Sequence, residues 1–301
     1  ARALFEDLRV VIIDEIHALA SSKRGDLLAL ALARLRRWAP AHRRVGLSAT
    51  VADERALARW LDGAGNEIVV HAPPGAPPQI EVLDSEADIP WAGHMARHAM
   101  PDVYAAIRNA RLALVFVNTR AQAELTFQEL WRINEAGLPI ALHHGSLDAA
   151  QRRKVEAAMA AGSLRAVVCT STLDLGIDRG DVDLVIQIGA PKGCSRLVQR
   201  IGRANHRLDE PSRALLAPSN RFEVLECRAA QEAVAEGALD GGEPRIGALD
   251  CLAQHIMGCC CGEAVDADEL YQEAISAAPY AALARAQFDR AFDLVATGGY
   301  A

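Results

Sequence analysis

The feature of this chain that most constrains its fold is the regular alternation of short apolar runs with helix-forming segments. The clearest strand candidates are Leu112–Val117, Arg165–Cys169 and Val182–Ile188. Apolar runs of this length are typical of parallel strands buried on both faces. We therefore predict an α/β fold, a parallel sheet with helices on both faces, whose ligands lie beyond the carboxyl ends of the strands.

The same alternation is present in the first 70 residues. Val10–Ile13 reads as a buried strand and Leu27–Trp38 as a helix closed by Pro40. Arg44–Leu47 is a second short strand, and Asp53 can cap a helix that runs through Trp60. The stretch 71–78 holds four prolines and indicates a linker.

Between and after the central strands we predict further elements. They are a helix over Ala121–Ala136, a strand over Leu138–Leu142, a helix from Asp148 to Ala161 closed by Gly162, and a helix from about Ser195. After residue 241 the pattern changes to three helices, Leu249–Met257, Asp268–Ala277 and Arg285–Ala296.

Composition limits the class of protein. Half of the residues (51%) are apolar, which excludes disorder over most of the chain. The sequence has no apolar run of the roughly 20 residues that span a bilayer, and its seven cysteines do not indicate a disulfide framework, so we expect a reducing cytoplasm. The net charge is −7, with +3 over residues 1–222 and −10 over 223–301. A simple electrostatic nucleic-acid binder would be far more basic.

An acidic pair follows the first strand. Asp14 and Glu15, in the run Asp-Glu-Ile-His, can hold Mg²⁺ through one carboxylate and orient or deprotonate a water through the other. Alternatively, such a pair simply begins a helix. Ser48 and Thr50 follow the next strand, where hydroxyl residues also commonly cap helices.

A second cluster suits phosphate. Gln199, Arg200 and Arg203 lie at a helix and offer two guanidinium groups, an arrangement that can reach a γ-phosphate as an arginine finger does. The alternative is a solvated helix face. Arginine dominates the basic set, with lysine only at Lys23, Lys154 and Lys192; this reflects either a coding bias or phosphate recognition.

Taken together, six motifs resemble motifs II to VI of superfamily 2 helicases in order and spacing. They are Asp14–His17, Ser48–Thr50, Val115–Arg120, His144–Ser146, Thr170–Asp178 and Gln199–Arg203. The runs 199–207 and 221–227 are similar to the Lhr (large helicase-related) family. Ile89–His94 and the C-terminal stretch resemble its bacterial ligase-associated DEXH-box branch.

The resemblance implies two RecA-like lobes that clamp ATP, followed by a mostly helical winged-helix-like domain. On this reading, residues 1–75 are the C-terminal part of lobe 1, 76–110 a linker and lead-in, 111–240 a complete lobe 2, and 241–301 the winged-helix-like domain, truncated. Asp14 and Glu15 would handle the Mg²⁺ of ATP and the attacking water, with Arg203 and Arg200 as catalytic arginines. Residues for nucleotide binding and coupling would be His17, Ser48, Thr50, Gly176, Asp178 and Gln199. Residues for the nucleic-acid backbone would be Thr119, Arg120, Gly145, Ser146, Thr170 and Ser171.

The implied activity is ATP-dependent translocation or unwinding of DNA, 3′ to 5′, in DNA repair. The expected partners are single-stranded DNA or a duplex with a 3′ tail, an ATP-dependent DNA ligase and a nuclease. The expected location is the cytoplasm, at the nucleoid, and no membrane partner is expected. An RNA-directed helicase and a nucleotide-independent binding or annealing module stay as alternatives, because hydroxyl, guanidinium and backbone amide groups meet phosphates of either nucleic acid.

Two departures from the family pattern affect these expectations. The last arginine of motif VI falls at His206, with Arg207 one place later. The phosphate loop needs Gly-Lys-Ser/Thr, and no lysine here follows a glycine. We therefore expect a fragment of a longer helicase that starts just before motif II and is inactive alone.

Two further patterns have a simple alternative. Cys251, His255 and Cys259 share one helical face and could hold a metal, although buried cysteine is the simpler interpretation. Among the four tryptophans, those in helical patterns indicate packing, and Trp91 in the linker is the candidate contact for nucleic acid.

Overall fold

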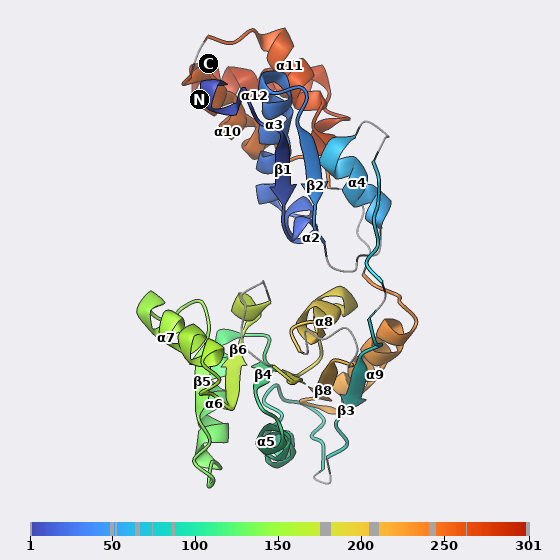
Figure 1. Cartoon of the computed structure of the whole chain (residues 1–301), viewed down its shortest axis with the longest axis vertical. Coiled ribbons are helices and arrows are strands. Elements are labelled where there is room, and N and C mark those ends of the chain that lie inside the picture. The colour runs from blue at the N-terminus through green and yellow to red at the C-terminus, as the bar shows by residue number, and fades with distance from the viewer. Residues whose placement is uncertain are drawn as a thin grey trace. The chain divides into compact units, whose positions relative to one another are not determined.

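The computed structural model describes residues 2–48, 51, 53–63, 67–73, 75–85, 88–174, 182–204, 211–240, 245–262 and 264–298. The chain forms two compact units (Figure 1). Unit 1 comprises residues 1–71 and 241–301, and unit 2 comprises residues 72–240. Unit 2 is therefore an insertion in the sequence of unit 1.

Unit 2 is built on a six-stranded sheet in which every pairing is parallel. In spatial order the strands are β3 (Gln79–Val82), β8 (Arg213–Ala217), β7 (Leu184–Ile188), β4 (Ala113–Phe116), β6 (Ala166–Cys169) and β5 (Ile140–His143). In the centre of the sheet Val115 is in register with Val168 and Ile186. All residues of β4, β6 and β7 are buried, as expected for strands covered on both faces.

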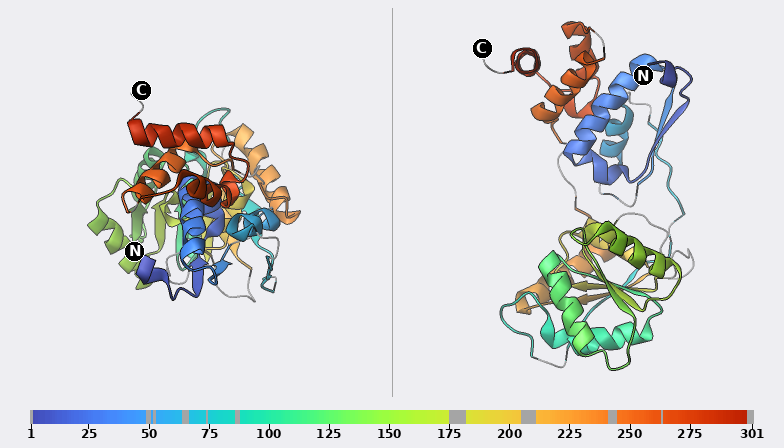
Figure 2. Two further views of the ribbon diagram at one scale, coloured as in Figure 1. Left: turned by 90° about the horizontal axis from the view of Figure 1, so that it is seen from above. Right: turned by 90° about the vertical axis from the view of Figure 1, so that its left-hand side faces the viewer.

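Five helices accompany this sheet: α5 (Met100–Asn109), α6 (Arg120–Arg132), α7 (Ala149–Ala160), α8 (Cys194–Ile201) and α9 (Arg221–Ala235). Because successive strand residues point to opposite faces, Val115 and Leu114 belong to different apolar clusters. Helices α5 and α6 contribute to the first cluster, and α7, α8 and α9 to the second. The predicted α/β sheet with helices on both faces is confirmed (Figures 1 and 2).

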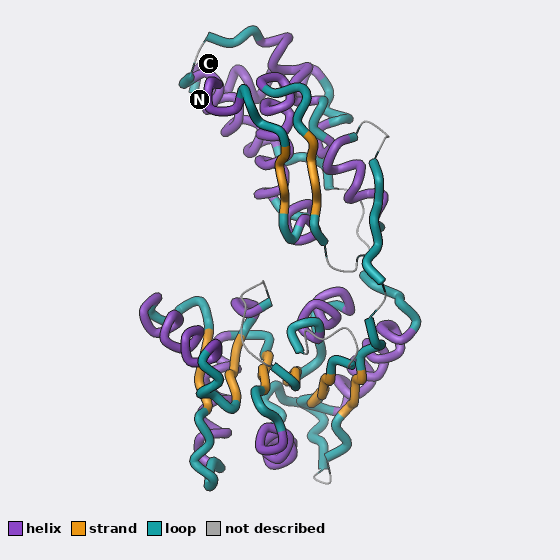
Figure 3. Tube along the Cα trace, in the orientation of Figure 1, coloured by secondary structure: helices purple, strands orange, loops and turns teal. Residues whose placement is uncertain are grey.

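Unit 1 combines the two ends of the chain. Its parallel strands and N-terminal helices are β1 (Val10–Ile13), β2 (Arg43–Gly46), α1 (Arg2–Phe5), α2 (Ile16–Ala20), α3 (Lys23–Trp38) and α4 (Glu54–Asp62). Its C-terminal helices are α10 (Leu249–Cys260), α11 (Ala267–Ile275) and α12 (Arg285–Thr297) (Figure 3). Leu30 on α3 packs in one core with Ile256 on α10 and Phe288 on α12. Short 3-10 turns cover Arg97–Ala99, Ser171–Leu173 and Ala278–Tyr280.

The helix starts follow the predicted capping chemistry. The Asp53 carboxylate accepts the N–H of Ala56 at 2.8 Å and begins α4, as predicted. The predicted strand Val10–Ile13 matches β1 in its bounds, and three helices follow residue 245, as predicted. The expected burial of this strand is wrong, because Val10 and Ile12 are exposed and the sheet of unit 1 has only two strands. Gly162 has a φ of +65°, which suits the glycine expected just after α7.

The predicted linker over 76–110 is wrong in part. It contains β3, an edge strand of the unit 2 sheet, and α5, which packs on that sheet. Prolines before residue 79 obscured the short strand, while Pro101 lies in the first turn of α5, where proline is well tolerated. The C-terminal helices also share a core with residues of the first lobe rather than standing apart. In the part of the chain that the structure describes, no helix is long and apolar enough to cross a membrane.

Candidate functional site

The acidic pair lies at the carboxyl end of β1 in unit 1. Asp14 follows the strand directly and is exposed, and its Oδ1 accepts the backbone N–H of Glu15 at 2.9 Å. Glu15 has φ 50° and ψ 43°, a left-handed conformation that non-glycine residues adopt rarely. This residue turns the chain sharply, so that α2 begins at Ile16 immediately after the strand.

Motif II and motif III are in contact in unit 1. The N–H of Ile16 donates to the carbonyl of Leu47 at 3.0 Å, and His17 Nδ1 lies 3.0 Å from Ser48 Oγ. His17 Nε2 lies 3.4 Å from Glu15 Oε2. One imidazole ring therefore connects the Glu15 carboxylate to the loop after β2. Thr50, predicted beside Ser48, lies outside the described residues.

The donor chemistry of this edge suits Mg²⁺. A hard divalent cation takes oxygen ligands, and Asp14 presents an exposed carboxylate at a strand end. Glu15 is partly buried and its carboxylate is paired with His17, which suits a group that orients a water rather than one that ligates the metal. The residues present thus fit the cofactor that the motif predicts.

Most of the residues predicted to meet the nucleic-acid backbone lie at one edge of the unit 2 sheet. Thr119 and Arg120 follow β4, Gly145 and Ser146 follow β5, and Ser171 follows β6. Because β4, β6 and β5 are neighbours and parallel, their carboxyl ends lie together. All five residues are exposed. The Thr119 hydroxyl also has a structural task, since it accepts the N–H of Gln122 at 3.1 Å and caps α6.

Thr170 differs from the prediction. Its side chain is buried, with 9% of the residue exposed, and its N–H donates to the carbonyl of His143 at 3.3 Å. It therefore joins the loops after β6 and β5, and the exposed hydroxyl of this loop is that of Ser171.

His143 is a structural residue of this edge that the sequence analysis did not identify. Its Nδ1 lies 2.9 Å from the hydroxyl of Thr172, and its Nε2 lies 3.0 Å from a carboxylate oxygen of Glu156. The ring is 2% exposed and bridges α7 to the loop after β6. Its position next to His144-Gly145-Ser146 was the only available signal.

The motif VI arginines have different environments. The Arg200 side chain is 3% exposed; its Nε donates to Asp174 Oδ1 at 3.0 Å, and Nη1 donates to Gln187 Oε1. Its guanidinium also lies 4.6 Å from the ring centre of Phe116. The structure thus gives Arg200 a buried position inside unit 2, rather than the catalytic position that the sequence predicted.

Arg203 and Gln199 are more accessible. Arg203 lies in the turn after α8 and is half-buried, as is Gln199 one turn earlier. Of the predicted nucleotide-site residues, Gly176 and Asp178 lie outside the described residues, as do His206 and Arg207.

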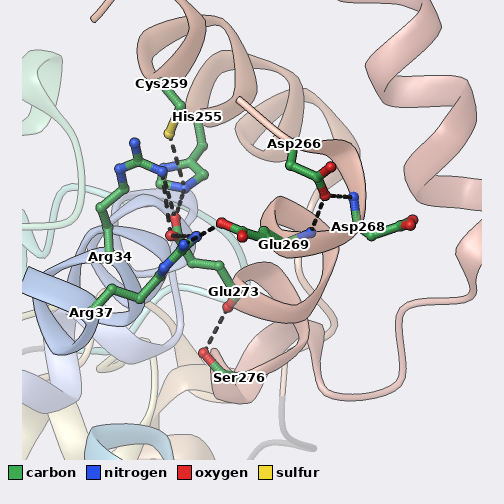
Figure 4. A network of polar contacts seen from close by, with 9 residues as sticks. All are labelled: Arg34, Arg37, His255, Cys259, Asp266, Asp268, Glu269, Glu273 and Ser276. Carbon is green, nitrogen blue, oxygen red and sulfur yellow. Dashed lines mark hydrogen bonds and ion pairs between the residues drawn. The ribbon is translucent and has the colours of Figure 1, made fainter. Parts of the chain in front are cut away.

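The cysteine and histidine cluster of α10 is part of a charge network (Figure 4). His255 Nε2 lies 3.2 Å from Glu273 Oε1 and 3.6 Å from Cys259 Sγ. The ligand atoms of these three residues lie within 4.8 Å of one another, a spacing that a metal ion could bridge. Cys251 is not one of them; its Sγ faces the carbonyl of Lys23.

The buried carboxylate of this network already has cationic partners without a metal. The Glu273 side chain is fully buried and lies 3.3 Å from Arg34 Nη1 and 3.2 Å from Arg37 Nη1. Burial lowers the pKa of His255, but hydrogen bonds to Cys259 and Glu273 outweigh this and raise it to about 9. Burial raises the pKa of Glu273, whereas His255 and Arg34 lower it, with a net lowering. A cation would be repelled by two guanidinium groups, so we interpret the cluster as an ion network that joins α3, α10 and α11.

Comparisons with known proteins agree with the motifs. Residues 1–58 match the DEAD/DEAH box helicase family, residues 97–207 the helicase conserved C-terminal domain, and residues 232–301 the winged helix domain of large helicase-related protein. Among curated relatives, the "Lhr helicase/ probable uracil glycosylase" of Mycolicibacterium smegmatis is 34% identical over 98% of this chain and 22% of its own length. The "ATP-dependent helicase Lhr-Core protein 2" of Thermococcus barophilus is 34% identical over 91% of this chain and 33% of its own length.

Solved structures show the same relationship. The Mycobacterium smegmatis helicase Lhr, solved with single-stranded DNA and AMP-PNP, superposes with a TM-score of 0.87 at 35% identity, over 97% of this chain and 39% of that one. The DUF1998 helicase MrfA bound to DNA shares the fold, with a TM-score of 0.68 at 22% identity, over 85% of this chain and 35% of that one. The chain spans about a fifth to a third of the length of the curated relatives described above. On the matched families, the motifs and the structural similarity, this chain belongs to the Lhr-type superfamily 2 helicases.

Proposed function

We propose that this chain is part of an ATP-dependent DNA helicase or translocase. The observation that carries the proposal is the contact of His17 with both Ser48 and Glu15, at the carboxyl ends of β1 and β2. A ring that touches the water-orienting carboxylate and the next strand's loop can transmit the state of the nucleotide to the rest of unit 1. The relative from Mycobacterium smegmatis, solved with single-stranded DNA and AMP-PNP, supports both ligand classes.

The residues of unit 1 would act on the phosphates and the water. Asp14 would hold Mg²⁺, which when bound neutralises charge on the phosphates of ATP. Glu15 would accept a hydrogen bond from the attacking water and orient it. His17, which lies 3.4 Å from that carboxylate, would keep it in place. Arg203, and Gln199 one turn earlier, would contact the nucleotide.

The edge of the unit 2 sheet would meet the strand. Arg120, Ser146 and Ser171 offer a guanidinium and two hydroxyl groups, and Gly145 exposes backbone. Groups of this kind bind phosphate oxygens and do not read bases. We therefore propose binding that is independent of sequence, with DNA as the substrate and RNA as the competitor to be tested.

The finer assignment rests on the resemblance of Ile89–His94 and the C-terminal stretch to the ligase-associated branch. On that basis we propose 3′ to 5′ movement and a role in DNA repair beside a ligase and a nuclease. Unwinding of duplexes with either a 3′ or a 5′ single-stranded tail tests the direction. Equal or better unwinding of the 5′-tailed duplex would contradict it.

The decisive experiment measures ATP hydrolysis by the natural protein that contains this chain, with and without single-stranded DNA. Glu15→Gln should lower DNA-stimulated hydrolysis by roughly 10³-fold, within the range of general-base contributions. DNA binding without nucleotide should stay unchanged. Glu6→Gln, at an exposed carboxylate of the same unit, is the matched control and should behave as the unaltered protein.

Hydrolysis that is independent of DNA, or that survives Glu15→Gln, would contradict the proposal. Competition between matched DNA and RNA strands in the same assay tests the substrate. If RNA stimulates ATP hydrolysis more strongly than DNA does, RNA becomes the proposed substrate.

A further inference from the structure

Residues 88–94, a segment without regular secondary structure, are held against the start of α9 in unit 2. The backbone N–H of Arg221 donates to the carbonyl of Pro90 at 3.0 Å, and its Nε donates to the carbonyl of Ile89 at 3.0 Å. Asn220, the N-cap of α9, donates through Nδ2 to the carbonyl of Gly93 at 2.9 Å. These bonds fix the position of Trp91 between them.

Trp91 forms an exposed platform with two residues of α9. The Arg221 guanidinium lies 4.5 Å from the centre of the Trp91 ring, and the Phe222 ring lies 6.4 Å away, tilted by 58°. Trp91 is 67% exposed and Phe222 is 64% exposed. Burying such rings in an apolar core would stabilise the fold, so a pair of exposed rings, one on the fixed segment and one on α9, indicates an interaction site.

The chemistry of the platform suits a nucleotide. An indole ring stacks on the face of any base, and a guanidinium beside it attracts the phosphate and supports the ring from its other side. A purely apolar protein partner would not need the cation. The platform also has two independent rings, which can hold successive bases.

The position of the platform places it beside the residues proposed to meet the nucleic-acid backbone. Gln122, in the first turn of α6 next to Arg120, donates through Nε2 to the carbonyl of His94 at 2.6 Å. An exposed cation follows each of β4, β7 and β8: Arg120 at the start of α6, Lys192 in the loop before α8, and Arg221 at the start of α9. These strands are consecutive in the sheet, so the outer two lie about 10 Å apart. That distance corresponds to about three stacked nucleotides at ~3.4 Å each.

We propose that Trp91, supported by Arg221 and Phe222, stacks on a base of the single strand whose phosphates contact the neighbouring strand-end loops. The inference deepens the proposed function and rests on it. It adds a contact to the base face, whereas the residues named so far meet only the backbone. Because every base has an aromatic face, the contact strengthens binding without reading sequence.

The test measures the affinity of the natural protein for a labelled thymidine 12-mer and for an abasic strand of the same length. Both strands carry the same phosphates, and only the first can stack. Trp91→Ala should weaken binding of the thymidine strand roughly tenfold, within the range measured for single stacking contacts, and leave the abasic strand unaffected. Trp91→Phe should retain most of the affinity.

Trp131→Ala is the matched control. Trp131 lies in the same unit, is 58% exposed and stacks on Phe127, but it belongs to α6 and not to the platform. Its removal should leave both affinities unchanged. The preference for the thymidine strand should therefore fall in Trp91→Ala and not in Trp131→Ala.

Two results would overturn the inference. If Trp91→Ala binds the thymidine strand as tightly as the unaltered protein, the platform serves another partner, such as a protein. If it loses affinity equally for both strands, Trp91 acts through the fold of its loop. In either case the unaltered protein still binds DNA and the proposed function stands. If the unaltered protein binds neither strand, both the proposed function and this inference are overturned.

Discussion

The two units use charged residues for different purposes. In unit 2 a six-stranded sheet is covered on both faces by apolar clusters, and Arg120, Lys192 and Arg221 are exposed cations that follow three of its strands. In unit 1 the sheet has two strands, with Ile12 64% exposed, and two carboxylates are fully buried. Asp26 on α3 accepts hydrogen bonds from Arg245 and from the N–H of Ala248, and Glu273 on α11 pairs with Arg34.

The difference shows what each unit needs for stability. A two-stranded sheet is marginal by itself, so unit 1 depends on helices from both ends of the chain. Its buried ions join α3 to the C-terminal segment. Unit 2 has enough apolar core that most of its charges can stay at the surface and act on ligands, although Arg200 and Asp174 also form a buried pair there. Removing a buried charge should therefore affect the stability of unit 1, whereas removing an exposed cation at the strand ends should affect the function of unit 2.

The largest expected effect concerns function in unit 2. Arg203→Ala in the natural protein should lower DNA-stimulated ATP hydrolysis by roughly 10³-fold or more, because a finger guanidinium stabilises charge that develops in the transition state. Single-turnover hydrolysis and DNA affinity without nucleotide are the two measurements. Affinity should hardly change. Near-normal hydrolysis would assign the finger role to another residue, and a loss of folded protein would break the comparison between the units.

The next effect concerns stability in unit 1. Glu273→Gln keeps the shape of the side chain but leaves Arg34 and His255 without their buried counter-charge, which should cost about 3–5 kcal/mol. Calorimetry should show unit 1 unfolding earlier while the transition of unit 2 is unchanged. Glu269→Gln is the control. The Glu269 side chain is 64% exposed and pairs with Arg37, so its substitution should have little effect on stability. Equal destabilisation by both variants would contradict the assigned role of the buried network.

A smaller effect should appear with pH. The folded pKa of His255 is raised to about 9, above the ordinary value of 6.5. The stabilisation of unit 1 by charged His255 is therefore fully present below about pH 6.5 and is lost as the pH rises through 9. It contributes at most about 3 kcal/mol to the free energy of unfolding. The free energy of unfolding of unit 1 at pH 6.5 and pH 9.5 measures it, and His255→Gln should remove most of this difference. An equal pH dependence in the variant would assign the titration to another group.

The smallest effect concerns a single phosphate contact. Arg120→Ala should weaken binding of single-stranded DNA modestly and equally for all base sequences. The slope of log affinity against log salt concentration should fall by about 1, as expected for the loss of one phosphate contact. The protein should unfold as before, because Arg120 is exposed. Titrations with homopolymers at several salt concentrations provide the measurement. A change in base preference with unchanged affinity would contradict the backbone contact.

Local patterns predicted the strands and caps of this chain because their causes are local. The run Val10–Ile13, the Asp53 cap and the glycine after α7 each depend on neighbouring residues. The edge strand β3 was missed because it has only two apolar residues, Ile80 and Val82, which are partly buried and alternate with the exposed Gln79 and Glu81. Helix α5 was overlooked although a proline in its first turn was a usable signal.

The candidate site was predictable to the same extent. The order of motifs indicated the strand ends and the pair Asp14–Glu15. His17 and Ser48, to which the resemblance assigns a coupling role, lie in contact in the structure. The burial of Arg200 was not predictable, since its partner Asp174 lies 26 residues earlier and meets it only in the folded sheet. The network around Glu273 depends on a contact with Arg34 across 239 residues, which no local pattern reports.

The insertion of unit 2 within unit 1 has a consequence for synthesis on the ribosome. Helix α3 is translated before unit 2, but the C-terminal helices that cover its apolar face are translated only after the whole of unit 2. At translation rates of 5–20 residues per second, the 239 residues between Arg34 and Glu273 correspond to a delay on the order of 10 to 50 s. Unit 2 can fold during this interval, whereas the nascent unit 1 keeps Leu30 and its neighbours uncovered. The first part of the chain is thus the segment for which a chaperone would be most useful.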